Sequence, residues 1–552
     1  MDGKSILKRH DNMSSNVIGN WMNLWQECAD WCYPSNDNIN RIRVGGQEKP
    51  PQRMIDTCIE ANYTFASGFF SHMFPPNTIW ARYRHPNPLV MQNEQIAQYF
   101  EEVSRVIHQI LLGSNFAQEE FQALLSLGCF GTNCLSLEES DSDIVRFKNY
   151  TINNIRVSEN KHHLVDTISR EYELTAKQAI EEFGLEVLKK ANLDKIIQDA
   201  EHGKNGKYKF IQYVAPRTDY VYYSKKVTDK PFASYHVSRD SKEIVKESGF
   251  DYNPYKVSRF MTGNEEIYGR SPMSNCLSTA RRTNVVYRSM IISAELNANP
   301  QWLIPDDDSV SGMSNRAGSF IKWRSTNPMG KPERLQSNGN PQLAFQMYEQ
   351  HEGDIKRMFF NHLFRPLDDY RNMTATEVQE RMTTDLMQLT PFVARYIEEH
   401  VSPIMEQLYY IADKRGMLPE MPQDLLDDPK YEVNYVGRLS LATKSFETMG
   451  AINTLRVFGE LSQLSPQMAQ SLDNVQPDKL FREIWYANSS SMNALKDPKS
   501  VNDEREAIAQ QQAIMQQMQM QMQQEQANAN NIEKLSKPIQ EGSPLGDAIN
   551  EQ

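Results

Sequence analysis

Apolar side chains recur at every third or fourth position along several stretches of the chain, which is the spacing of one buried face of an α-helix. In the first half, this pattern predicts helices over residues 13–34, 55–73, 90–112, 115–127 and 175–190. Strand-like patterns are found over residues 79–84, 133–139, 143–152, 208–223 and 232–245. The first half is therefore predicted to be an α+β region in which helices lie outside a mixed sheet.

The middle of the chain has the pattern of two helices separated by an insert. Residues 272–297 and 342–363 each carry apolar positions at helical spacing, and the segment between them is rich in proline and glycine, which favour turns. Strands are predicted within this insert at residues 301–304 and 319–324. A short, highly charged break, RPLDDYRNM, follows the second helix at residues 365–373.

The next helix is predicted to begin at Thr374. Thr374 and Glu377 have the spacing of a capping box, in which each side chain satisfies a free backbone donor of the first turn. The apolar stripe continues to Ile411 and contains Pro391 and Pro403. Each proline removes a helix hydrogen bond and clashes with the preceding turn, so kinks are predicted near both.

The C-terminal part is predicted to be mainly helical after a strand at residues 431–437. Residues 503–534 are dense in Gln and Met, with almost no β-branched side chains. This composition favours helix and carries little charge. The segment lacks a clean heptad pattern of apolar residues.

The charge balance limits how the chain interacts with nucleic acid. The 552 residues include 59 Lys and Arg against 71 Asp and Glu, which gives a formal net charge of −12. A protein that holds DNA through counterion release needs a basic footprint, which this composition does not provide. The composition remains compatible with a protein that touches DNA without holding it. No stretch approaches the ~18 apolar residues that span a bilayer, so no membrane partner is predicted.

Motifs of the common catalytic sites are absent from the sequence. The chain has no phosphate-binding loop, dinucleotide-binding glycine motif, G-x-S-x-G motif or H-E-x-x-H motif. Its six cysteines form no C-x-x-C pair, so they are predicted to be reduced, mostly buried thiols, with a metal site as the alternative. We therefore predict no catalytic residue, no metal site and no cofactor.

Four blocks of the sequence, in this order, resemble the head-to-tail connector (portal) proteins of short-tailed bacteriophages. They are residues 55–84, 114–139 and 268–286, and the block that starts with MTATEVQERM at Met373 and continues to Ser445. The order and spacing of these blocks over residues 15–485 make the resemblance specific.

The resemblance implies a predominantly helical α+β subunit of the portal type, assembled into a ring. Its segments would be a wing (1–270), a first stem helix (271–298), a clip (299–341), a second stem helix (342–364), a channel loop (365–373), a kinked helix with a return strand (374–439), a crown (440–500), a C-terminal barrel helix (501–536) and a flexible tail (537–552). The ring would be a homododecamer at one capsid vertex.

The same resemblance implies the partners. Double-stranded DNA would pass through the channel without sequence specificity during genome packaging and ejection. The clip would bind the terminase large subunit during filling and then the tail adaptor and nozzle proteins. The wing would contact the major capsid and scaffolding proteins. The subunit would be in the host cytoplasm during assembly and in the virion at the vertex between head and tail.

Two sets of candidate site residues follow from the resemblance. The channel-loop candidates are Arg365, Asp368, Asp369 and Arg371. The alternative interpretation of this segment is an ordinary solvated turn that caps two helices. The clip candidates are Trp302, Arg316, Lys322, Trp323 and Arg324. For these residues, strand packing and surface charge are the alternative.

Two other functions are compatible with the residues when the resemblance is set aside. A non-ring cytoplasmic helical scaffold protein with a Gln/Met interaction tail would form no closed assembly. A nucleic-acid-processing enzyme with an unrecognised site would show metal-dependent nuclease or nucleotide-hydrolysis activity.

Overall fold

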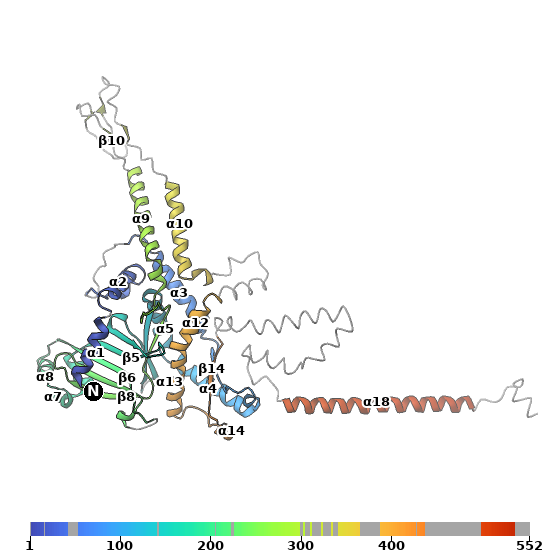
Figure 1. The fold of residues 1–552 in the computed structure, drawn as a ribbon. Coiled ribbons are helices and arrows are strands. Elements are labelled where there is room, and N and C mark those ends of the chain that lie inside the picture. Colours follow the sequence, from blue (N-terminus) through green and yellow to red (C-terminus); the bar gives the residue numbers. More distant parts are fainter. Residues whose placement is uncertain are drawn as a thin grey trace, which may run out of the picture. The chain divides into compact units, whose positions relative to one another are not determined.

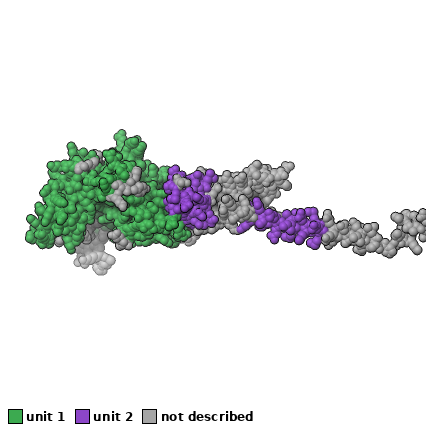
Figure 2. Space-filling view, turned by 90° about the horizontal axis from the view of Figure 1, so that it is seen from below, with its two compact units in different colours: residues 1–84, 102–420, 431–489 green, residues 85–101, 421–430, 490–552 purple. Residues whose placement is uncertain are grey.

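The computed structural model describes residues 2–15, 17–41, 53–140, 143–204, 206–221, 226–298, 341–364, 387–426, 428–436 and 498–535, with four two-residue strands between positions 302 and 334 (Figure 1). The chain divides into two units, which Figure 2 shows in different colours. Unit 1 comprises residues 1–84, 102–420 and 431–489, and unit 2 comprises residues 85–101, 421–430 and 490–552. Helix and sheet are both present, and helix predominates.

A five-stranded antiparallel sheet in unit 1 is covered on both faces. Its order is β4 (Ile155–Glu159), β5 (Val165–Thr175), β6 (Lys207–Pro216), β7 (Phe232–Ser238) and β8 (Ile244–Phe250). The covering helices are α1 (Gly3–Ser15) on one face, and α6 (Ala176–Phe183), α7 (Leu185–Lys190) and α8 (Asp194–Glu201) on the other. Successive side chains of a strand point to opposite faces. Phe210 of β6 accordingly packs with α6–α8, and Ile211 packs with α1.

A separate three-stranded antiparallel sheet has the order β3 (Ile144–Asn149), β2 (Thr132–Ser140) and β9 (Tyr255–Arg259). Every strand pair that the structure describes is antiparallel, so the predicted mixed sheet is wrong. Alternation along a strand defines its two faces but does not identify its neighbours. The outer edge of β3 is capped by Asn115, whose side chain exchanges hydrogen bonds of 2.9 and 2.8 Å with the Phe147 backbone. Such a cap protects the edge from further strand pairing.

The helices near the sheets differ in two places from the sequence prediction. The helices near the sheets are α2 (Asn20–Cys32), α3 (Thr57–Met73), α4 (Glu94–Leu112, whose first part belongs to unit 2) and α5 (Phe116–Phe130). The helix predicted over residues 13–34 begins at Asn20, and α1 was not predicted. The helix predicted over residues 175–190 is divided into α6 and α7 by Gly184, whose φ of 82° interrupts the helix.

The helices predicted around the insert are present as α9 (Pro272–Ala298) and α10 (Pro341–Met358). Later elements of unit 1 are α12 (Thr390–Tyr396), a π-turn (Ile397–Val401), α13 (Ser402–Lys414) and β14 (Glu432–Tyr435), which pairs with β1 (Ala81–Arg84). Unit 2 includes α14 (Gln423–Leu426) and α18 (Pro498–Leu535), which contains the predicted Gln/Met helix. Short 3-10 helices are Pro34–Asn36, Val90–Gln92, Ile152–Asn154, Val227–Asp229 and Asn361–Phe364. The capping box at Thr374 and the predicted crown lie outside the described residues.

Candidate functional site: the α9–α10 pair and the insert between its helices

Helix α9 is buried at its beginning and exposed further along. Ser271 and Ser274 cap its first turn reciprocally, since each backbone N–H donates to the Oγ atom of the other residue (3.0 and 2.8 Å). Its buried residues lie between Pro272 and Thr283, in the part that contacts α2 and α5. No residue of α9 after Thr283 is buried. The second half of α9 therefore extends away from the sheets, as Figure 1 shows.

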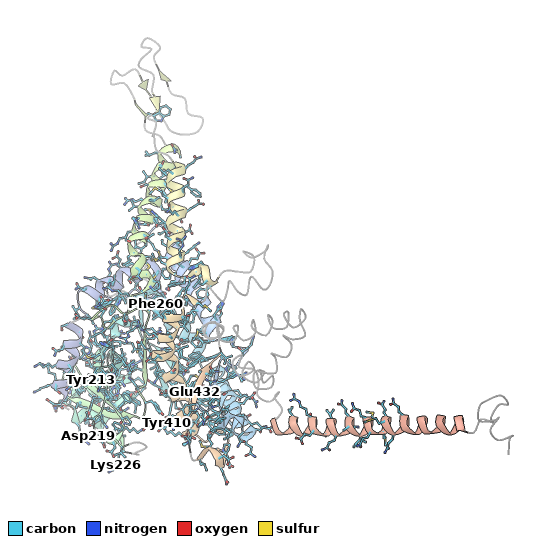
Figure 3. The ribbon with its side chains drawn as sticks, turned by 45° about the vertical axis from the view of Figure 1, so that its right-hand side comes forward. Tyr213, Asp219, Lys226, Phe260, Tyr410 and Glu432 are labelled. Atoms are coloured by element: carbon cyan, nitrogen blue, oxygen red, sulfur yellow. The ribbon has the colours of Figure 1, made fainter. Side chains whose placement is uncertain are left out.

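Helix α10 packs along α9 through a row of side chains at helical spacing. The rings of Tyr287 and Tyr348 meet with centroids 5.4 Å apart. Further along, Ile355 and Phe359 are fully buried. Ile355 follows Tyr348 by seven positions, which keeps these two residues on one helix face, and Phe359 lies directly after the end of α10. The helices lie side by side in both Figure 1 and Figure 3.

The outer surfaces of the two helices carry exposed apolar side chains. They are Val285, Ile291, Ile292 and Leu296 on α9, and Leu343, Phe345, Met347 and Met358 on α10. Val285 is 63% exposed and Leu343 is 54% exposed. A cluster of large apolar side chains in water indicates a surface that another macromolecule covers.

Some basic side chains of the α9–α10 pair are matched by carboxylates, whereas the Arg282 guanidinium donates to the Ser278 backbone oxygen and the Thr279 hydroxyl. The Arg281 guanidinium makes two hydrogen bonds to the Glu27 carboxylate, at 2.6 and 2.5 Å. The Lys356 ammonium lies 3.0 Å from Glu352 and 3.5 Å from Glu60. Ion pairs on a surface stabilise a fold only weakly, but they cancel charge that would otherwise attract phosphate.

The base of the pair rests on a cluster of aromatic rings. Phe260, which Figure 3 labels, lies 4.4 Å from Phe392 and 6.1 Å from Phe360, measured between ring centroids. Phe392 in turn lies 5.1 Å from Phe69 of α3. Aromatic packing of this kind contributes beyond the burial of area. The cluster connects α3, the end of β9, the end of α10 and α12.

The insert contains two nested antiparallel strand pairs. Strands β10 (Trp302–Leu303) and β13 (Glu333–Arg334) form the outer pair, and β11 (Val310–Ser311) and β12 (Lys322–Trp323) form the inner pair. The strands predicted at residues 301–304 and 319–324 contain β10 and β12. Trp302 is half-buried on β10. Lys322 and Trp323 lie on β12, where their backbones pair with Ser311 and Val310.

The remaining predicted site residues lie outside the part of the chain that the structure describes. They are Arg316 and Arg324 of the insert, and Arg365, Asp368, Asp369 and Arg371 of the charged break. Their assignment to a clip and a channel loop stays a prediction.

Comparison with known proteins identifies the family. The family model described as "Bacteriophage head to tail connecting protein" matches residues 4–487. The chain belongs to this family. It is similar to the portal protein of Salmonella phage epsilon15, with 24% identity and 88% of each chain covered. It is also similar to a probable portal protein of Bordetella phage BPP-1, with 22% identity and 82% of each chain covered. The chain is therefore a phage head-to-tail connector, or portal protein, as the resemblance implied.

The cysteines of this connector are buried thiols, as predicted. All six are free and buried. Burial raises the pKa of Cys129 to about 11, so its thiol is not activated as a nucleophile. Among the described residues, no group of three or more His, Cys, Asp or Glu side chains is arranged to hold a metal ion. No described helix of the connector combines the length and apolarity that a membrane span requires.

The connector contains a buried polar network that its sequence did not predict. Glu120 of α5 is fully buried and contacts Tyr396 and His400, which are 276 and 280 positions away in the sequence. Burial and the Glu120 carboxylate raise the pKa of Tyr396, so its hydroxyl stays protonated and donates to Glu120. The only local signal was a one-residue irregularity in the apolar stripe between Tyr396 and Val401.

Proposed function

We propose that this connector assembles into a closed ring, a homododecamer at one capsid vertex, through which double-stranded DNA passes during packaging and ejection. The observation that carries the proposal is the exposed apolar surface of the α9–α10 pair. A monomer would leave these side chains in water, whereas head-to-tail contacts between copies would bury them and close by rotation. The rival helical scaffold that forms no ring offers no reason for this surface, and the family match removes its support.

We propose that each segment of the chain forms a different part of the ring. Residues 1–270 would form the wing, α9 and α10 the stem, and residues 299–341 the clip. Residues 365–373 would form the channel loop, and the helix after it would lead outward. Residues 440–500 would form the crown, and the Gln/Met helix, α18, would form one wall of a barrel.

The channel is proposed to let DNA slide because its wall does not bind phosphates strongly. A wall of unpaired Lys and Arg would retain the polyanion, whereas a neutral or acidic wall keeps it centred. The net charge of −12 and the carboxylate partners of Arg281 and Lys356 support this interpretation. No catalytic step is needed from the connector itself, so we propose that it is not an enzyme.

The partners are proposed from the same arrangement. The clip would bind the terminase large subunit during filling, and afterwards the tail adaptor and nozzle proteins. The wing would contact the major capsid and scaffolding proteins. Clip candidates for these contacts are Trp302, Arg316, Lys322, Trp323 and Arg324.

The ring is tested by electron microscopy of the purified full chain. We expect closed rings for the wild type and dissociated subunits for the double variant Ile292→Glu, Leu343→Glu, because buried carboxylates without partners weaken an interface. The control is Leu185→Glu, which places a carboxylate at an exposed apolar position of α7. A monomeric wild type, or a double variant that forms rings as readily as the control, would contradict the proposal.

A further inference from the structure

The helix from Thr390 to Lys414 contains one residue more than a regular α-helix would accommodate between its two halves. In α12 the buried side chains are Phe392, Val393 and Tyr396. In α13 they are Ile404, Met405, Gln407, Leu408, Ile411 and Ala412, preceded by Val401. After Tyr396 the buried polar residue His400 follows at a step of four, and the apolar stripe resumes at Val401, at a step of five instead of the three or four of an α-helix. The π-turn Ile397–Val401 takes up the extra residue, so both halves face the same core.

A fully buried carboxylate holds one side of this π-turn. The Glu120 side chain accepts a hydrogen bond from the Tyr396 hydroxyl, and its other oxygen lies 2.9 Å from Nε2 of His400. Glu120 and His400 both have zero exposure. The Nδ1 atom of His400 is buried and has no hydrogen-bond partner among the described residues. Glu120 therefore contacts the residue before the turn and a residue inside it.

Buried Arg259 binds the carboxylate of Glu399, which lies within the π-turn. The backbone N–H of Arg259 donates to Glu399 at 2.9 Å, and its guanidinium donates to Glu399 at 3.1 and 2.6 Å. The same guanidinium bonds Glu159 of β4 and the backbone oxygen of His163. The side chains of Arg259 and Glu399 are only 4% and 7% exposed. The π-turn is thus tied to the three-stranded sheet through Arg259 and to the five-stranded sheet through Glu159.

Two physical features distinguish this arrangement from ordinary core packing. A π-turn is rare and is often found where a helix has a functional irregularity. Buried charges cost free energy to desolvate and give little net stability compared with apolar packing, so such networks specify one arrangement among several. A one-residue change in helix register rotates one half by about 100° and moves it by about 1.5 Å relative to the other. The π-turn contains the one extra residue that such a change in register requires.

We propose that the π-turn Ile397–Val401 is a register device, in which Glu120 and Arg259 hold one spare helix residue in place. When these contacts are released, the π-turn becomes α-helical. Helix α12 then rotates by about 100° and shifts by about 1.5 Å relative to α13. The α12 half leads back along the chain to residues 365–373. The consequence for DNA passage rests on the proposed function, because it requires those residues to be the channel loop. The register change in the isolated chain does not depend on it.

The first test deletes Glu398, an exposed residue within the turn. The deletion leaves a step of four from Tyr396 to Val401, so the halves keep their phase but lose the spare residue. The deletion chain is expected to fold and form rings as the wild type does, while DNA-filled particles fall at least tenfold. The control is Glu398→Ala, which keeps the length and is expected to fill normally. Deletion particles that fill and release DNA normally would overturn the role of the register change in DNA passage.

The second test needs no particle and decides the question if the deletion chain fails to fold. Glu120→Gln keeps the shape of the side chain and removes its charge. Backbone hydrogen exchange over residues 390–401 is expected to accelerate at least tenfold, with exchange in β5–β7 unchanged. The control Glu27→Gln removes a half-buried carboxylate that pairs with Arg281 and should leave residues 390–401 unchanged. Exchange in Glu120→Gln that is unaltered, or equally faster throughout the chain, would refute the lock.

The outcomes also separate this inference from the proposed function. A wild-type chain that forms no ring contradicts the proposed function. Intact rings with faster local exchange in Glu120→Gln would support the lock whatever the role of residues 365–373. Intact rings whose Glu398 deletion fills normally, together with unaltered local exchange in Glu120→Gln, would contradict only the register device.

Discussion

Tyr287 of α9 and Tyr348 of α10 pack ring against ring with centroids 5.4 Å apart, beyond the last fully buried residue of α9. This contact joins two helices that are separated in the chain by the whole insert. We expect Tyr287→Ala and Tyr348→Ala to be non-additive, with a coupling of about 0.5–1.5 kcal/mol. Urea unfolding of the single and double variants at one protein concentration measures it. Tyr348→Ala with Val285→Ala serves as the control, and full additivity of the tyrosine pair would contradict the contact.

Gly131 ends α5 in a left-handed conformation with φ of 76°, directly before β2. A Cβ atom there would lie 2.4 Å from the Gly269 carbonyl oxygen, so a side chain would force the two backbones apart. Gly203 also has a positive φ, of 64°, but its Cβ would meet nothing within 4 Å. Gly203→Ala should lower the free energy of unfolding by about 1–2 kcal/mol through backbone strain alone. Gly131→Ala should cost clearly more in the same unfolding experiment, and equal costs would contradict the predicted clash.

His236 of β7 gives unit 1 a specific sensitivity to acid. Burial, together with the positive charges of Lys246 and Arg170, lowers the pKa of His236 to about 3. In the unfolded chain the imidazole binds a proton near pH 6.5, so between those values the unfolded state holds more protons. Stability should therefore fall as the pH decreases from about 6.5, by at most about 1.4 kcal/mol per unit.

The variant His236→Gln isolates this effect. It retains an acceptor for the Tyr172 hydroxyl, which lies 2.8 Å from Nδ1 of His236. The free-energy difference between wild type and variant should shift against the wild type between pH 7 and pH 4.5. The exposed His163→Gln is the control. A difference that does not change with pH would show that His236 titrates normally.

The predicted channel loop is tested by reversing its acidic charges. Asp368→Lys with Asp369→Lys should leave rings intact but impair DNA packaging or retention, because added lysines bind phosphates and resist movement. Glu181→Lys with Glu186→Lys makes the same change in charge at exposed positions near α7. Filled particles are counted for both. Normal filling by the loop variant would discredit the assignment of residues 365–373.

Elements whose signals are local could be predicted from the amino-acid sequence. Proline, glycine and helical spacing located α9, the insert and α10, because these signals depend on neighbours within a few residues. The blocks around Ile55, Ser114, Tyr268 and Met373 carry the resemblance to the family. Local patterns also predicted that the cysteines are buried.

Contacts between distant segments could not be predicted from local patterns and are known from the folded chain. Asn133 of β2 and Ser258 of β9 are 125 positions apart and share a hydrogen bond, and Glu120 reaches His400 across 280 positions. Alternation and spacing state which face of an element is apolar, but not which other element covers it. The mixed sheet was predicted wrongly for this reason. The π-turn was not predicted because a one-residue shift in the apolar stripe of a helix indicates a π-turn only if both halves of that helix pack against the same core. That shared core is known only from the folded chain.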